Sequence, residues 1–411
     1  MRRFRRQTLH VTERAISITH ALQRATALRA KIGITRVGET TRLHRIAIPT
    51  MCAVVPDSPD DVSVYNGRGL TRSEAYVGAV MEAVERQTAA YCPIRGRIDF
   101  PARVRTLNLQ ACGLRPQFKH RLLEFVPAED LLTGESIEVP KALVQMPWKG
   151  PPAFPMTHTN GLAAGFSRDE AVYHALQELV ERHLYGVTHA RAHLRPKRLL
   201  RDILGTDDIP IVDDPVDEIA QPTGVPTVDR LCDMFASDGL RLRLVAMHAP
   251  PLPIGVLAGI CDPQRGDFRA GLGCAWSPIT AAIRALTEAA QARAADVQAA
   301  RENILRAGDP PSAFTANTRR RTFLPHGRWY FDAPTQLVRL RDFPDAAGSL
   351  PGNLRRLVES IATFASRIAI VDLSPPDGEF FVVRAIVAEM ETLIIDGRVG
   401  RIARAIIDEA A

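Results

Sequence analysis

A short helical pattern occurs three times in this chain and constrains its fold more than any other feature. Ser73–Arg86 reads SEAYVGAVMEAVER, Asp169–Arg182 reads DEAVYHALQELVER, and Ala281–Gln291 is a weaker copy with AAIRALTEAAQ. Each copy is rich in alanine, almost free of proline and glycine, and long enough for about three helical turns. The sequence therefore predicts three similar helices.

Each predicted helix carries two oxygen-bearing side chains three residues apart, which places them on one face. The pairs are Glu82 and Glu85, Glu178 and Glu181, and Glu288 and Gln291. If the three faces converge, five carboxylates and one amide line a single cavity. Carboxylates that crowd together stay ionised only when cations neutralise them. Hard oxygen ligands of this kind suit Mg²⁺, which usually brings phosphate groups as further ligands.

A single copy has a simpler interpretation as a solvated helix face. The pair Glu82–Arg86 at i,i+4 would then contribute only about 0.3–0.5 kcal/mol. Three copies, each preceded by a loop of similar character, favour the converging arrangement instead. The arginines Arg86, Arg182 and Arg284 are expected on or beside the same faces.

Composition indicates an ordinary globular chain with a substantial core, since 46% of its 411 residues are hydrophobic and 24% are charged. Such a length allows two or three domains or one large α/β unit. The net charge of +6 is spread along the chain and no nucleic-acid-binding module is recognisable, so no nucleic-acid partner is expected. No apolar run approaches about 18 residues, so no membrane partner is expected. Six cysteines without metal-ligand spacing predict buried thiols in a cytoplasmic protein.

Hydrophobic periodicity predicts alternating helices and strands along the chain. Helices are expected over 11–31, with Thr12 as its cap, and over 226–238 and 352–366. Strands are expected over 34–37, 45–55, 62–65, 241–247, 254–262, 368–373 and 380–390, with a hairpin over 124–144. Segment 202–225 reads as a surface loop, and 271–278 reads as the lead-in to the third helix.

Glycines precede the first two predicted helices. Gly67 and Gly69 would let backbone N–H groups approach an anion at the positive end of the first helix. Gly161 and Gly165 flank a small-residue turn before the second helix, which Ser167 or Asp169 would cap. A glycine-rich turn is also common without any ligand, and neither a Walker motif nor a dinucleotide-binding fingerprint is present.

The motifs together resemble a known family. GRGLTRSEAYVGAVMEAVER, TNGLAAGFSRDEAVYHALQELVER and SPITAAIRALTEAAQAR are similar, in order and spacing, to the three signature segments of the YcaO family. The stretch IGITRVGETTRLHRIAIP is similar to the lead-in of YcaO proteins encoded beside TfuA-like partners. The resemblance implies a single large α/β (α+β) unit with carboxylate-bearing helices on β-sheets. We expect an N-terminal helix and strands over 1–60, the ATP-binding catalytic domain over 61–390, and a helical tail over 391–411.

The same resemblance implies ATP and Mg²⁺ as cofactors and assigns roles to residues. Metal-binding positions are matched by Glu82, Glu85, Glu178, Glu181 and Glu288. Nucleotide-binding positions are matched by Thr157, Asn160, Arg86, Arg182, Arg284 and Gln291. Arg284 and Glu288 are also the expected catalytic residues, because Arg284 could neutralise the phosphoryl group that is transferred.

Family members phosphorylate a backbone amide oxygen of a ribosomally made peptide. Attack by a Cys, Ser or Thr side chain then gives an azoline, and attack by sulfide gives a thioamide, the product associated with TfuA-linked members. The ending DEAA lacks the proline-rich terminus of azoline-forming members, which favours thioamide formation here. A precursor peptide and a TfuA-like or leader-binding protein are the expected partners, and a homodimer is left open. The non-enzymatic alternative is a catalytically silent scaffold that docks a peptide.

Overall fold

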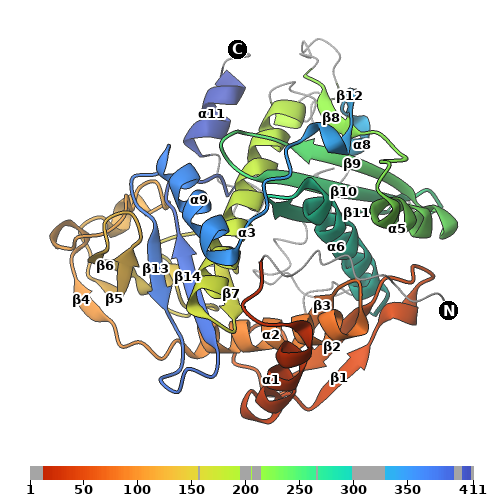
Figure 1. The fold of residues 1–411 in the computed structure, drawn as a ribbon. Coiled ribbons are helices and arrows are strands. Elements are labelled where there is room, and N and C mark those ends of the chain that lie inside the picture. The colour runs from red at the N-terminus through yellow and green to blue at the C-terminus, as the bar shows by residue number, and fades with distance from the viewer. Residues whose placement is uncertain are drawn as a thin grey trace.

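The chain builds three β-sheets connected by long helices (Figure 1). The computed structural model describes residues 13–155, 158–194, 205, 214–264, 267–298, 329–392 and 400–408. One sheet has the order β1 (Arg36–Glu39), β2 (Thr50–Val54), β3 (Val64–Arg68). A second has the order β11 (Asp267–Ala275), β10 (Ile254–Asp262), β9 (Arg241–Met247), β8 (Val216–Ile219), β12 (Thr335–Val338).

The third sheet has the order β4 (Arg97–Asp99), β5 (Leu123–Asp130), β13 (Ala369–Asp372), β14 (Phe381–Ile386), β7 (Leu162–Gly165), and β6 (Glu135–Pro140) pairs with β5. Within the described part of the chain, β8 and β12 form the single parallel pair and all other pairs are antiparallel. Mixed helices and antiparallel sheets agree with the expected α/β (α+β) class.

The three repeated segments each form a long helix that follows a strand. These helices are α2 (Arg72–Tyr91) after β3, α3 (Arg168–His189) after β7, and α6 (Pro278–Gln298) after β11. Each helix packs on its own strand and also contacts the strand of another unit: α2 contacts β7, α3 contacts β11, and α6 contacts β3. The three strand–helix units therefore close into a ring around the middle of the view in Figure 1.

Glycine makes the contact between strand and helix unusually close. A Cβ atom on Gly67 would lie 2.1 Å from both the carbonyl oxygen of Ala75 and the nitrogen of Ala79 on α2. A Cβ atom on Gly271 would lie 2.2 Å from the carbonyl oxygen of Ala285 and from the nitrogen of Ala289 on α6. Since any side chain would collide there, these glycines serve packing.

Thr71 and Glu74 form a capping box at the start of α2, in which Thr71 Oγ1 accepts from the backbone nitrogen of Glu74 and Glu74 Oε2 accepts from that of Thr71. The anion approach expected beside Gly67 and Gly69 stays a prediction. Ser167, one of the two predicted caps, accepts a hydrogen bond from the backbone nitrogen of Glu170 at the start of α3. The segment between Gly161 and Gly165 is strand β7 and not a turn, because it pairs with β14.

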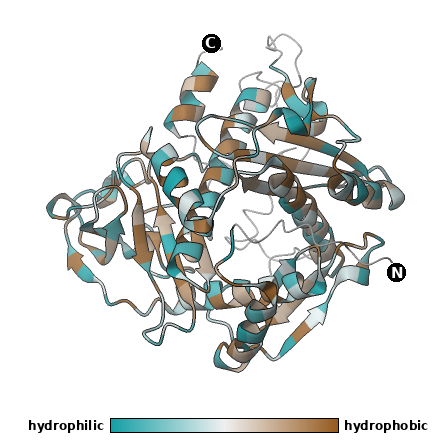
Figure 2. Cartoon of the chain, viewed as in Figure 1, coloured by the Kyte–Doolittle hydropathy of each residue, from teal (hydrophilic) through white to brown (hydrophobic). Residues whose placement is uncertain are grey.

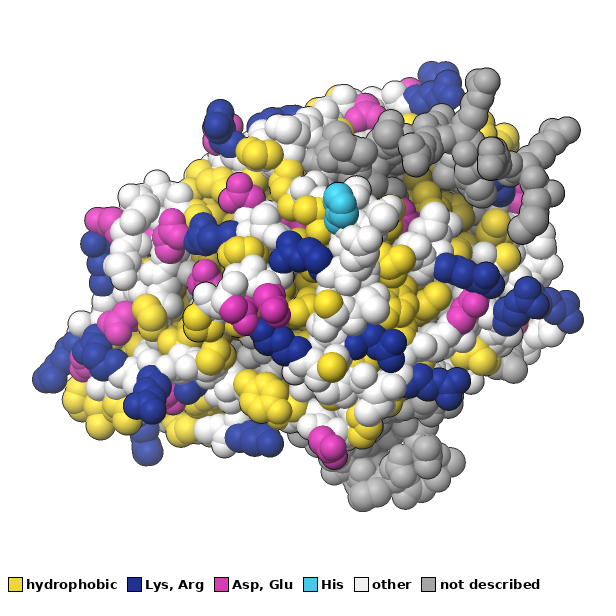
Figure 3. All heavy atoms as spheres, turned by 60° about the horizontal axis from the view of Figure 1, so that its bottom comes forward, with side chains coloured by type: hydrophobic (Ala, Val, Ile, Leu, Met, Phe, Trp, Pro, Cys, Tyr) yellow, Lys and Arg dark blue, Asp and Glu magenta, His cyan; other side chains and the backbone are white. Residues whose placement is uncertain are grey.

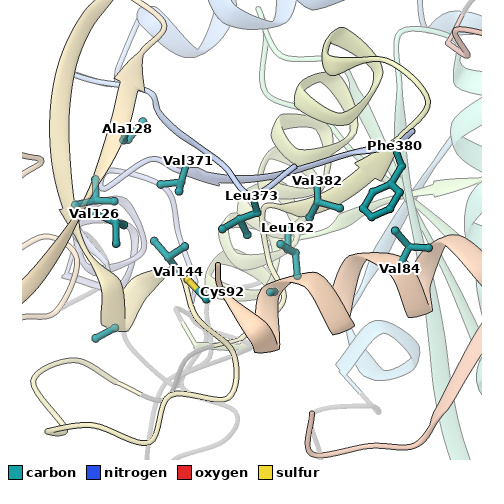
Figure 4. Packing of buried hydrophobic residues seen from close by; sticks show 14 of the residues in the cluster. Val84, Cys92, Val126, Ala128, Val144, Leu162, Val371, Leu373, Phe380 and Val382 are labelled. Carbon is teal, nitrogen blue, oxygen red and sulfur yellow. The ribbon is translucent and has the colours of Figure 1, made fainter. Parts of the chain in front are cut away.

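Each long helix buries its apolar side in a different hydrophobic cluster. In the cluster of α2, Val84 lies close to Phe380 and Val382 at the edge of β14 (Figure 4). Hydrophobic residues run along β10 and β14, where most side chains are buried (Figure 2). All six cysteines are buried free thiols, as the sequence predicted.

The remaining helices are α1 (Ile18–Lys31), α5 (Pro226–Ser237), α8 (Trp329–Asp332), α9 (Leu350–Ala362) and α11 (Arg401–Asp408). A π-helical turn, Ala190–Leu194, extends α3. Short 3-10 turns occupy Thr41–Leu43, Pro101–Arg103, Pro116–Phe118, Lys141–Leu143 and Leu340–Asp342. Among the described residues, no helix has the length and apolar character of a membrane span. Acidic and basic side chains are interspersed on the face shown in Figure 3.

Two sequence expectations need correction. The first helix begins at Ile18 with Ser17 as its cap, and Thr12 lies outside the described residues. Residues 271–278 lead into α6 as expected, and residues 271–275 belong to strand β11, whose alternate glycines let it lie directly on α6. Residues 216–219, expected within a loop, form β8 by pairing with β9 and β12.

Candidate active site

Acidic residues from α3 and α6 meet around one arginine. Arg182 Nη1 lies 3.4 Å from Glu181 Oε1, and Arg182 Nη2 lies 3.7 Å from Glu178 Oε1 and 3.8 Å from Glu288 Oε1. The side chains of Glu181 and Arg182 are only 11% and 21% exposed. One guanidinium thus neutralises carboxylates from two of the three helices.

Strand β3 contributes a second arginine to this cluster. Arg68 Nη2 donates to Glu288 Oε2 at 2.5 Å, and Arg68 Nη1 donates to Gln291 Oε1 at 3.0 Å. Because β3 leads directly into α2, Arg68 connects the first strand–helix unit to the acidic face of α6.

The carboxylates of α2 complete the cluster. Burial raises the pKa of Glu85 well above its ordinary value, and the negative charges of Glu178 and Glu82 raise it further. The buried Arg384 of β14 feels both Glu178 and Glu85; burial lowers its pKa to about 10 although these carboxylates act in the opposite direction. The acidic faces of α2 and α3 therefore lie close together, with Arg384 as a compensating charge.

Burial and nearby negative charges raise the pKa values of two carboxyl groups on α3. The pKa of Glu181 is raised to about 7, first by burial, while Arg182 opposes the rise and Glu288 and Glu178 add to it. Burial likewise raises the pKa of Glu178. A cation that binds these carboxylates would displace their protons and reduce the repulsion between them.

Two glutamates are held by backbone N–H groups in the same way. Glu82 Oε2 accepts from the nitrogen of Asn66 at 2.7 Å, and Glu178 Oε2 accepts from the nitrogen of Gly161 at 3.2 Å. Beside them, the side-chain nitrogens of Asn66 and Asn160 are buried and have no hydrogen-bond partner among the described residues. Buried donors without partners are costly, and the oxygen atoms of a nucleotide would satisfy them.

Two of the predicted nucleotide-binding arginines form their ion pairs with carboxylates other than the five helix glutamates. Arg86 pairs with Asp60, with Nε–Oδ2 at 2.7 Å and Nη2–Oδ1 at 3.0 Å. Arg284 Nη2 donates to Glu13 Oε2 at 2.6 Å. Both arginines still lie beside the acidic faces because, against the lowering effect of burial, Glu82 raises the pKa of Arg86 and Glu181 raises the pKa of Arg284. Their role in nucleotide binding stays a prediction. Thr157 lies outside the described residues.

Within the described ranges, no three or more His, Cys, Asp or Glu side chains are arranged to hold one metal ion. Glu288 itself pairs with Arg68 and Arg182. Mg²⁺ needs only one or two carboxylates when phosphates and water complete its shell. One or two of these glutamates would therefore be enough to hold a metal ion that brings phosphate ligands with it, and the full set of five metal ligands stays a prediction.

A family model described as "YcaO cyclodehydratase, ATP- and Mg2+-binding" matches residues 66–391. The chain belongs to the YcaO family. It is therefore a member of a family of ATP- and Mg²⁺-binding, peptide-modifying enzymes, and the predicted cofactors are confirmed at that level. The single YcaO-type fold is confirmed by solved structures.

One similar structure is that of YcaO from Methanopyrus kandleri bound with AMPPCP and Mg²⁺, with a TM-score of 0.66 and 24% identity over 96% of this chain and 97% of the other. A heterocyclase in complex with substrate and cofactor has a TM-score of 0.69 and 17% identity, over 92% of this chain and 53% of that one. A chain of the E. coli microcin synthetase McbBCD complex has a TM-score of 0.61 and 14% identity, over 86% of this chain and 88% of that one.

Two sequence relatives are both described as uncharacterized. The first, from Methanothermobacter thermautotrophicus, is 32% identical over 90% of this chain and 93% of its own length. The second, from the tfuA 3′ region of Rhizobium leguminosarum bv. trifolii, is 32% identical over 66% of this chain, which spans 64% of that relative.

Sequence reasoning did not assign a role to Arg68 or Arg384. Arg384 had a signal, because a cationic residue inside the apolar strand sequence FFVVRAIV is rarely buried without a compensating charge. Arg68 had no such signal, since nothing in the local sequence shows that it reaches α6. Both arginines balance charges that come from distant parts of the chain.

Proposed function

We propose that this chain uses ATP and Mg²⁺ to activate a backbone amide oxygen of a ribosomally made peptide, which sulfide then replaces to give a thioamide. The observation that carries the proposal is the meeting of glutamates from α2, α3 and α6, with raised pKa values on Glu85, Glu178 and Glu181. A solvated helix face would not crowd carboxylates in this way.

The side chains of the site would have two kinds of role, metal binding and nucleotide binding. Glu82, Glu85, Glu178, Glu181 and Glu288 would hold the metal ions. Asn160, Arg182, Gln291, Arg284 and, by resemblance, Arg86 and Thr157 would contact the nucleotide. ATP supplies the phosphoryl group that turns the amide oxygen into a leaving group. The chain would contribute alignment and charge neutralisation, with Arg284 and Glu288 nearest to the transferred group.

Thioamide formation is supported by the relative whose description places it in a tfuA 3′ region, since a TfuA-like protein is then the natural partner. The heterocyclase structures support the alternative, an azoline formed from a Cys, Ser or Thr side chain of the peptide. Both products begin with the same activated amide, so the carboxylate cluster serves either.

Mass spectrometry of a precursor peptide co-expressed with this chain and its TfuA-like partner distinguishes the products. We expect a mass gain equal to the exchange of one oxygen for one sulfur. Loss of one water would establish the azoline alternative instead. An unchanged peptide, together with no MgATP binding by the purified chain, would favour a docking scaffold. A Glu288→Gln variant is the matched control and should leave the peptide unmodified.

A further inference from the structure

Glu13 lies far from the three signature segments in sequence, yet it is built into the surroundings of Arg284. Its side chain is 6% exposed. Glu13 Oε2 accepts from Arg284 Nη2 at 2.6 Å, and Glu13 Oε1 accepts from the Tyr173 hydroxyl at 2.9 Å. Residue 13 precedes the region that the family model matches, which begins at residue 66.

These contacts close into a ring of hydrogen bonds. Gln177 Nε2 donates to the Tyr173 hydroxyl at 3.0 Å, and Gln177 Oε1 in turn accepts from Arg284 Nη1. Arg284 Nη1 also donates to the carbonyl oxygen of Cys274 at 2.9 Å. Tyr173 and Gln177 are 0% and 4% exposed, so the ring is held within the protein.

The hydrogen-bond ring engages some of the N–H donors of Arg284 and leaves others without a partner among the described residues. Of the five N–H donors of an arginine, both on Nη1 and one on Nη2 of Arg284 have partners in the ring. The Nε–H and the second Nη2–H have no partner among the described residues. Free guanidinium donors of this kind can bind phosphate or carboxylate oxygen atoms.

The charge of Arg284 also depends on Glu13. Burial alone would lower the pKa of Arg284, but the carboxylate of Glu13, then Tyr173 and Glu181, raise it. The influence of Glu181 places this guanidinium beside the carboxylate cluster. Arg14 holds the same segment in place, since its Nη1 lies 3.2 Å from the buried Oε1 of Glu170 on α3.

We propose that Glu13 is a positioning residue that holds Arg284 so that its two remaining N–H donors can bind the phosphates of ATP. This inference rests on the proposed function, because it requires a nucleotide beside Arg284. The N-terminal segment would then be part of the nucleotide site.

Isothermal titration with MgATP on the full chain tests the inference. Glu13→Gln keeps the shape of the side chain and its oxygen acceptor but removes the charge, so we expect MgATP affinity to fall about tenfold. In an Arg284→Gln background the same change should have almost no further effect, because Glu13 would act through Arg284. Lys31→Ala, which breaks an exposed ion pair of the same segment with Asp377 and Glu379, should leave affinity unchanged.

Equal affinity of wild type and Glu13→Gln, or additive losses in the double variant, would overturn the positioning role while leaving the proposed function intact. Tighter binding by Glu13→Gln would also overturn it, because Glu13 would then compete with phosphate for Arg284. Failure of the wild type to bind MgATP would overturn the inference and the proposed function together. Thermal unfolding of each variant separates a loss of folding from a loss of binding.

Discussion

Three arginines balance much of the negative charge of the acidic cluster. Arg182 lies within 4 Å of carboxylates on both α3 and α6. Arg68 pairs with Glu288, and Arg384 lies near Glu178 and Glu85. Without these cations the buried carboxylates would have to take up protons to remain in the fold. A nucleotide with its metal ions would compete with the arginines for the same oxygen atoms.

The ionisation of Glu181 predicts how pH affects binding. The folded protein holds a proton on Glu181 up to about pH 7, whereas its ordinary pKa is 4.5. Because the folded state binds the extra proton, this group makes the nucleotide-free fold less stable as pH rises from 4.5 to about 7. A metal ion displaces that proton, so MgATP affinity should rise between about pH 6 and about pH 8.

Titration of MgATP at the two pH values checks this prediction, with Glu181→Gln as the control. The control reports the protonation of the nucleotide itself, so its rise should be smaller than that of the wild type. Identical pH dependence in both proteins would contradict a role for the Glu181 proton.

Single residues show where sequence reasoning succeeded and where it could not. Spacing on a helix correctly placed Glu178 and Glu181 on one face, since that depends only on local geometry. It could not show that Arg86 pairs with Asp60, because Asp60 comes from a turn whose position depends on the packing of β2, β3 and α2. Partners from distant segments require the tertiary structure.

At the scale of elements, the packing of each long helix on its own strand determines where its acidic face lies. The helices were predictable because long alanine-rich segments favour one conformation. Strand β11 was not fully predicted, since its glycines weaken the sequence signal of a strand. Their packing role becomes apparent only in contact with α6. The ring of three units depends on contacts such as α6 with β3, which no local pattern encodes.

Replacing Gly67 by alanine tests that close packing. The new methyl group would meet the backbone of Ala75 and Ala79 at 2.1 Å, and backbone cannot move aside as a side chain can. We expect the free energy of unfolding to fall by about 3 kcal/mol or more. Gly38→Ala is the matched control in β1, because its methyl group would meet only side-chain atoms at 3.7 and 3.9 Å. Urea unfolding that gave equal values for both variants would contradict the packing role of Gly67.

At the scale of the whole molecule, the ring of three strand–helix units brings together residues separated by more than 200 positions, such as Arg68 and Glu288. The N-terminal segment takes part through Glu13, and β14 takes part through Arg384. The expected domain boundary at residue 60 remains a prediction. Strands β2 and β3, which lie on either side of this boundary, pair in one sheet. A site assembled from so many segments depends on the integrity of the entire fold.

Isothermal titration with MgATP on one variant for each helix is the most direct test of a shared site. Glu82→Gln, Glu178→Gln and Glu288→Gln should each weaken binding by about tenfold or more relative to the wild type. Glu138→Gln on strand β6, where Glu138 pairs with the exposed Arg97, should bind as the wild type does. Wild-type affinity in any one of the three helix variants would contradict a single nucleotide site built from all three helices.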